Sequence, residues 1–181
     1  MDRLTFMRFL GLGPGKRVPD AKTIWLFREQ LKEAGLVEEL FKKFDRHLQA
    51  SGFIARKEQI VDASIVSVPK QRNTREENAL IKEGGKPEDW NDPKRWQKDT
   101  DARWLKENGK NEYGYKNHVN VDVKHKLIRG YAVTDAGVHD SRVFGDLLHG
   151  DNSSGDVYAD SAYRSVESLE MLHEGGYREH L

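Results

Sequence analysis

Two aspartates of this chain each lie in a short apolar stretch that has the composition of a buried strand. Asp62 lies within residues 59–66, and Asp160 ends residues 156–160. An ionised carboxylate inside a strand is costly unless a partner compensates for its lost hydration. Because the two aspartates are far apart in sequence and both fall on predicted strands, we expect them to share a divalent cation.

Composition excludes several classes of protein. The 181 residues suit one domain, or one domain with a small appendage. Lys+Arg and Asp+Glu both number 30, so no global basic field indicates a nucleic-acid partner. There are no cysteines, which excludes disulfides and thiolate metal sites. No apolar run approaches the length of about 20 residues that spans a bilayer, and residues 1–6 lack the apolar core of a signal peptide. We expect a cytoplasmic protein with no membrane partner.

Residues 1–57 are predicted to be helical. Apolar residues recur at helical spacing in three segments, with Asp20 as an N-cap and with Gly35 and Gly52 at helix ends. Short helices joined by glycine turns are compatible with a helix-turn-helix DNA-binding unit. The alternative is a small helical bundle that only packs on the next domain, and spacing alone favours this alternative.

Residues 70–112 differ in composition from the rest of the chain. About half of them are charged, apolar residues are sparse, and Trp90, Trp96 and Trp104 are spaced through the segment. We interpret it as a long insertion or loop, partly helical, in a domain formed by residues 58–181. Such loops are functional or disordered. Basic residues with interleaved tryptophans can contact phosphates and stack on bases. A solvated loop held by a few aromatic residues explains the pattern equally well.

From Tyr113 onward the pattern predicts a hairpin, a helix, a strand and a closing helix. Val119, Val121 and Val123 alternate with polar residues, which predicts a strand with a valine face that is buried. On its other face we expect His118 and Asp122 to be solvated or to face DNA. A second strand follows at 127–134, and Asp140 or Ser141 is predicted to cap a short helix. With the strand at 59–66, these elements form a mixed α/β sheet.

Several strings resemble bacterial insertion-sequence DDE transposases, and more narrowly the group usually called the IS-five family. They are the first strand Ile60-Val61-Asp62-Ala63-Ser64-Ile65-Val66, the segments 97–104 and 113–118, the turn Thr134-Asp135-Ala136-Gly137-Val138-His139-Asp140-Ser141, and the motif Tyr158-Ala159-Asp160-Ser161-Ala162-Tyr163. Residues 18–28 resemble the helical domain that precedes the catalytic core in these proteins. Their order and spacing together are specific.

The resemblance implies an RNase H-like mixed sheet preceded by a small all-α domain, and a protein that cuts and joins DNA at transposon ends. It implies that Asp62 and Asp160 are catalytic and bind Mg²⁺, or Mn²⁺ in its place. Two ions about 3.5–4 Å apart flank the scissile phosphate in such chemistry, and hard oxygen ligands suit Mg²⁺. The implied partners are double-stranded DNA, as terminal inverted repeats and target DNA, and further copies of the chain in a homo-oligomer. The implied location is the bacterial nucleoid.

Other polar residues of these strings have competing explanations. Asp160 can simply cap the helix that follows it, and capping by Asp140 explains that position without a metal. Tyr163 and Arg164 are candidates to position the motif or to contact a phosphate, although packing is favoured for Tyr163. No residue is assigned to DNA binding.

The third carboxylate of the family is a Glu on a later helix, after a further strand. Four glutamates follow Asp160, and we assign none of them to that role: Glu167, Glu170, Glu174 and Glu179. We therefore expect a sheet that is incomplete at its C-terminus, a truncated transposase, and little strand transfer by this chain alone. A DNA-binding regulator without catalytic activity, a nuclease without preference for element ends, and a non-functional remnant with an unpaired sheet edge stay open.

Overall fold

A computed structural model describes residues 3–13, 16–53, 58–107, 109–150 and 155–181. The chain divides into two units, Met1–Gly52 and Phe53–Leu181. No helix within the described ranges is long and apolar enough to cross a membrane.

The first unit contains three helices, as the apolar spacing predicted. They are α1 (Arg3–Phe9), α2 (Ala21–Glu33) and α3 (Val37–Ala50). Asp20 caps α2, since its Oδ1 accepts the backbone N–H of Thr23 at 2.7 Å. Gly35 follows α2 with a φ of 66°, a value that glycine adopts without strain. None of the residues of α2 or α3 is buried, so both the DNA-binding and the bundle interpretations stay predictions.

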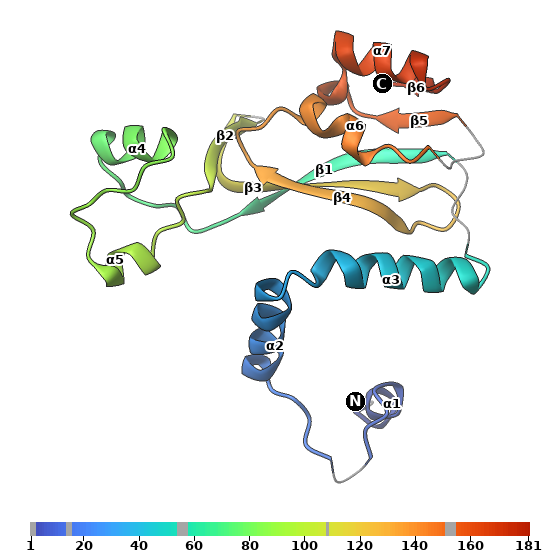
Figure 1. Ribbon diagram of the computed structural model, residues 1–181, viewed down its shortest axis with the longest axis horizontal. Helices are drawn as coiled ribbons and strands as arrows, with labels where there is room; N and C mark the ends of the chain where they lie inside the picture. The colour runs from blue at the N-terminus through green and yellow to red at the C-terminus, as the bar shows by residue number, and fades with distance from the viewer. Residues whose placement is uncertain (1–2, 14–15, 54–57, 108, 151–154) are drawn as a thin grey trace. The chain divides into compact units, whose positions relative to one another are not determined.

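The second unit is built on one mixed sheet (Figure 1). Its strands are β1 (Gln59–Ser67), β2 (Arg103–Glu107), β3 (Lys110–Asp122), β4 (Ile128–Asp135), β5 (Asp156–Ala159) and β6 (Arg178–His180). β3 lies between β1 and β4 and is antiparallel to both. β5 is parallel to β1, and β6 is parallel to β5. The order β4-β3-β1-β5-β6 joins antiparallel pairs around β3 to the parallel strands β1, β5 and β6, so the sheet is mixed, as predicted.

β6 is a strand that the sequence pattern did not predict. Residues Asp156, Val157 and Tyr158 of β5 pair with Arg178, Glu179 and His180. β6 has only three residues and lacks an apolar alternation, so its sequence does not predict a strand. Pairing with β5 supplies the backbone hydrogen bonds that the sequence pattern does not reveal.

One face of the sheet carries the core. The short helices η1 (Asp140–Val143), α6 (Phe144–Leu147) and η2 (Ser161–Tyr163), with α7 (Val166–Glu174), supply the apolar residues that cover it. The buried cluster consists of Val61, Phe144, Leu147, Val157, Tyr163 and Leu172. Figure 1 shows α6 and α7 beside the β5 end of the sheet.

The predicted insertion is more ordered than its composition suggests. It contains α4 (Arg75–Lys82) and α5 (Asp92–Trp96), followed by β2 and the first residues of β3. Strand structure therefore resumes at Arg103 rather than at Tyr113, because β2 pairs with residues 110–114 of β3. Thr74 begins α4 with a capping box formed with Glu77.

The two faces of β3 are reversed relative to the prediction. The side chains turned toward the core layer are Lys116, His118, Asn120 and Asp122, all buried, while Val119 and Val121 of the opposite face are only half-buried. His118 and Asp122 are 0% and 2% exposed, so neither is solvated or faces DNA. Buried polar groups need hydrogen-bond partners. The turns that follow β4 and β5 supply partners for Lys116 and His118, and Gln59 of β1 and Leu147 of α6 supply those of Asn120.

Candidate active site

Asp62 and Asp160 directly follow the last residue pair of the β1–β5 register. The parallel pairing of β1 with β5 ends at Val61 and Ala159, and the next residue of each chain segment is Asp62 and Asp160. Adjacent strands are about 4.8 Å apart, and paired residues of parallel strands point to the same face. The structure therefore brings together the two aspartates that the sequence singled out.

Neither aspartate is buried, which corrects the expectation of carboxylates inside a strand core. Both side chains are exposed. Val61 and Val157 turn into the core, so Asp62 points to the opposite face because successive residues of a strand alternate. Asp160 lies directly after β5 rather than within it. The apolar composition of these stretches comes from their alternate residues and not from burial of the aspartates.

Each aspartate uses one carboxylate oxygen in a local hydrogen bond. Asp62 Oδ1 accepts the N–H of Ala63 at 2.8 Å, and Asp160 Oδ1 accepts the N–H of Ala162 at 2.8 Å. Asp160 is thus the N-cap of η2, as the alternative interpretation held. The Oδ2 atoms have no partner among the described residues, so capping leaves one hard oxygen on each side chain for a cation.

These two carboxylates fit a divalent cation in donor type and in exposure. Mg²⁺ keeps several waters and uses few protein carboxylates. No group of three or more His, Cys, Asp or Glu side chains able to hold a metal occurs within the described part of the chain. The donor set that can be assigned here consists of Asp62 and Asp160.

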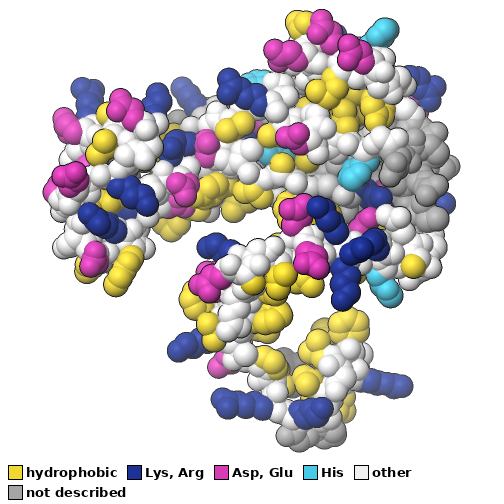
Figure 2. All heavy atoms as spheres, in the orientation of Figure 1, with side chains coloured by type: hydrophobic (Ala, Val, Ile, Leu, Met, Phe, Trp, Pro, Cys, Tyr) yellow, Lys and Arg dark blue, Asp and Glu magenta, His cyan; other side chains and the backbone are white. Residues whose placement is uncertain are grey.

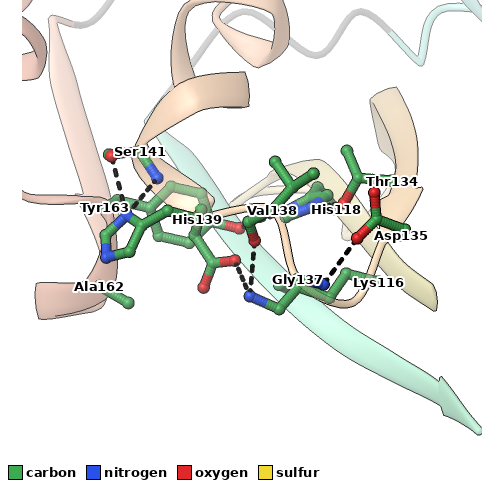
Figure 3. Close-up of polar contacts among 12 residues, drawn as sticks. Lys116, His118, Thr134, Asp135, Gly137, Val138, His139, Ser141, Ala162 and Tyr163 are labelled. Atoms are coloured by element: carbon green, nitrogen blue, oxygen red, sulfur yellow. Dashed lines mark hydrogen bonds and ion pairs between the residues drawn. The ribbon is translucent and has the colours of Figure 1, made fainter. Parts of the chain in front are cut away.

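The turn after β4 is fixed by a buried ion pair that sequence reasoning missed. Lys116 Nζ lies 2.7 Å from Asp140 Oδ1 and donates to the carbonyl of Val138 at 3.0 Å (Figure 3). The Lys116 and Asp140 side chains are only 9% and 13% exposed. Asp140 does not cap η1 as predicted: the cap is His139, whose ring accepts the N–H of Ser141. The sequence signal for this ion pair was the position of Lys116, which lies on the same face of the predicted strand as His118.

The turn after β5 is fixed in a similar way by His118. Its Nδ1 lies 3.1 Å from the hydroxyl of Tyr163, and its Nε2 lies 3.0 Å from Thr134 Oγ1. Burial lowers the pKa of His118. Burial, followed by the charges of Asp140, Asp62 and Asp160, raises the pKa of Tyr163 well above its usual range. The Tyr163 hydroxyl is therefore neutral and lies within the field of the aspartate pair.

The tryptophans of the insertion have different environments. Trp90 is 3% exposed, and its Nε1 donates to Glu77 Oε1 at 2.6 Å. Lys94 also donates to Glu77 Oε1, at 2.7 Å, and its Nζ lies 5.2 Å from the centre of the Trp90 ring. Hydrogen bonds from Lys94, Trp90 and the backbone of Thr74 lower the pKa of Glu77 to about 2. Trp90 therefore holds the insertion together and is not available to stack on bases.

Trp96 and Trp104 remain accessible. Their exposed fractions are 84% and 51%. On the face drawn in Figure 2, Lys and Arg side chains are interspersed with Asp and Glu side chains over the part of the molecule that contains α4 and α5. The stacking interpretation thus stays a prediction for these two tryptophans.

A groove of about 660 Å³ lies between α4 and the turn that follows β4. Lys82, Arg103 and Arg142 line it, together with His139 and one carboxylate, Asp135. The C-terminal ends of β1 and β4 lie at the same edge of the sheet, since β3 is antiparallel to both. The groove therefore offers an excess of positive charge at the C-terminal edge of β1 and β4, whereas Asp62 lies further back, within β1. No single sequence motif marks it, because its residues come from four separate segments.

Comparison with known families identifies the second unit. The model of a family described as transposase DDE domain matches residues 55–178, more than half of the chain. The match contains both Asp62 and Asp160. No solved structure matches this chain.

Proposed function

Because this chain belongs to the family of transposase DDE domains, we propose that it cuts and joins DNA strands at the ends of an insertion sequence. Asp62 and Asp160 are the metal-binding catalytic carboxylates in this proposal. The observation that carries it is their position directly after the last pair of the β1–β5 register, each with one oxygen free of hydrogen bonds to the described residues. The narrower assignment to the IS-five group rests on the sequence strings quoted above.

The proposed cofactor is Mg²⁺, with Mn²⁺ as a substitute. When bound, the cation supplies charge neutralisation at the phosphate and activates a water or hydroxyl nucleophile. The protein contributes the placement of its ligands. Asp62 is held by the rigid pairing of β1 with β3 and β5, and Asp160 by its cap at the start of η2.

The proposed partner is double-stranded DNA, as the inverted repeats of the element and the target site, bound by a homo-oligomer. The cations of the groove, Lys82, Arg103 and Arg142, support phosphate contacts on the same domain as the aspartates. We further propose that residues 1–57 form a helical DNA-binding domain and that residues 58–181 form the catalytic domain, with the insertion at 70–112.

The test is cleavage of a supercoiled plasmid that carries the genomic DNA flanking the gene on both sides. We expect Mg²⁺- or Mn²⁺-dependent nicking at the element ends, and its loss in Asp62→Asn and Asp160→Asn. Asp146→Asn, an exposed aspartate of α6, is the matched control and retains cleavage. Nicking that persists in both active-site variants contradicts the proposal, and nicking without preference for the ends indicates a general nuclease.

A second candidate is a DNA-binding regulator that occupies element ends without cutting them. The observation in its favour is that the described residues contain no group of three metal-binding side chains. It predicts binding to the end sequences in the presence of EDTA, unchanged by Asp62→Ala. Absence of sequence-specific binding under these conditions excludes it.

A further inference from the structure

The buried polar face of β3 holds two turns, the one that follows β4 and the one that follows β5. Lys116 holds the turn that starts η1, and His118 holds the turn η2 that Asp160 begins. In register His118 pairs with Ala63, the residue next to Asp62. A single side chain of β3, the strand next to β1, thus contacts the turn that carries Asp160.

The hydrogen bonds of His118 are directional and complete. The ring is fully buried, and its two nitrogens face two hydroxyl groups, those of Tyr163 and Thr134. In the neutral imidazole one nitrogen donates and the other accepts, and a hydroxyl can take either part. Both tautomers therefore satisfy both bonds, and the ring orientation is fixed.

Tyr163 fixes the turn from its other end. Its ring is 1% exposed and packs against Phe144, with the ring centroids 5.5 Å apart. Its backbone N–H donates to the carbonyl of Asp160 at 3.1 Å, while the side chain of Asp160 caps the same turn. A displacement of the Tyr163 hydroxyl therefore moves the backbone that carries Asp160.

We propose that Tyr163 is a positioning residue: its hydroxyl, bonded to His118, fixes the turn that carries Asp160 relative to Asp62 and so sets the spacing of the two carboxylates for a divalent cation. Packing of the ring against Phe144 is not directional, whereas the hydrogen bond to His118 is. Because β3 holds His118 opposite the residue that follows Asp62, this bond relates the position of the turn to that of Asp62. This inference rests on the proposed metal-binding role of the aspartates.

The experiment measures Mn²⁺ binding to the full chain by electron paramagnetic resonance, with melting followed by circular dichroism. Tyr163→Phe keeps the ring and removes the hydroxyl. We expect about tenfold weaker Mn²⁺ binding, the lower end of the range for loss of a group that supports metal ligands. Tyr158→Phe is the matched control, since Tyr158 lies on β5 two residues before Asp160 and its hydroxyl makes no hydrogen bond to a described residue; Mn²⁺ affinity is unchanged.

A second pair of variants distinguishes positioning from general loss of packing. The amide of Asn reaches the place of His Nδ1, whereas the amide of Gln reaches the place of Nε2. His118→Asn therefore keeps a partner for Tyr163, and His118→Gln keeps one for Thr134. We expect Mn²⁺ affinity within twofold of the original chain for His118→Asn and about tenfold weaker binding for His118→Gln, with similar melting temperatures.

Asp62→Asn separates failure of this inference from failure of the proposed function. If Asp62→Asn leaves Mn²⁺ binding unchanged, the metal assignment fails and the positioning role fails with it. If Asp62→Asn abolishes binding while Tyr163→Phe binds within twofold of the original chain, only the positioning role is overturned. Equal weakening in both His118 variants also overturns it.

Discussion

The ion pair between Lys116 and Asp140 allows a quantitative test of the site architecture. At the observed separation of 2.7 Å, two unit charges attract by about 6 kcal/mol at an effective dielectric constant of about 20. Desolvation costs several kcal/mol for each ion and offsets most of that attraction. The pair as a whole therefore contributes little net stability, whereas removal of one member leaves a buried charge without its partner.

The perturbation is a double-mutant cycle with Lys116→Met and Asp140→Asn. Each single change is expected to lower the free energy of unfolding by about 3 kcal/mol, near the lower end of the range for a broken buried pair, because both side chains retain slight exposure. In the double variant no charge is left without a partner, so its loss is smaller than the sum of the single losses by about 2 kcal/mol.

The assay is urea unfolding monitored by tryptophan fluorescence in a Trp25→Phe background. The remaining tryptophans, Trp90, Trp96 and Trp104, lie in the second unit, so the signal reports on that unit. Arg178→Met is the control: Arg178 pairs with Asp156 but its side chain is 74% exposed, so less than about 1 kcal/mol is expected. Single losses that add within about 0.5 kcal/mol refute the reasoning, because additivity means that the two charges do not depend on each other.

Three further predictions concern charge and packing in the second unit. Burial lowers the pKa of His118, so the free energy of unfolding falls as the pH drops below about 6.5, the unfolded-state value, by at most about 1.4 kcal/mol per pH unit; urea midpoints measured against pH check this. Replacement of Lys82 or Arg142 by Ala is expected to reduce the slope of log affinity for duplex DNA against log salt by about 0.9 each, measured by fluorescence anisotropy. Gly114→Ala places a Cβ 2.1 Å from the carbonyl oxygen of Val66 at a φ of +156°. The free energy of unfolding is expected to fall by more than about 3 kcal/mol, above the usual cost of overpacking, and a lower melting temperature checks this.

Each of these predictions has a matched control and a contradicting result. A pH dependence that is unchanged in His118→Gln contradicts the first. An unchanged salt slope, or an equal effect of Lys126→Ala outside the groove, contradicts the second. For the third, Gly176→Ala meets no atom within 4 Å at a φ of +70° and isolates backbone strain, so equal melting temperatures for the two glycine variants contradict the steric argument.

The sequence alone was enough to select Asp62 and Asp160 as candidate site residues and to predict the strands beside them. Asp62 and Asp160 could be found because short-range patterns suffice: an apolar alternation predicts β1, and the strand ending at Asp160 is followed by turn residues. The three helices of the first unit follow equally from local spacing, with Asp20 as a local cap. These features depend on residues within a few positions of each other, which a pattern records directly.

Tertiary structure decided which face of β3 is buried and what holds the turns of the site. Valines at alternate positions predicted an apolar core face, yet the helix layer covers the polar face of β3, because Lys116, His118 and Asn120 find partners on η1, η2, β1 and α6. β6 likewise became visible only through its pairing with β5. Alternation specifies that a strand has two faces, but the free energy of burying a polar face depends on partners more than fifteen residues away, and no local pattern contains them.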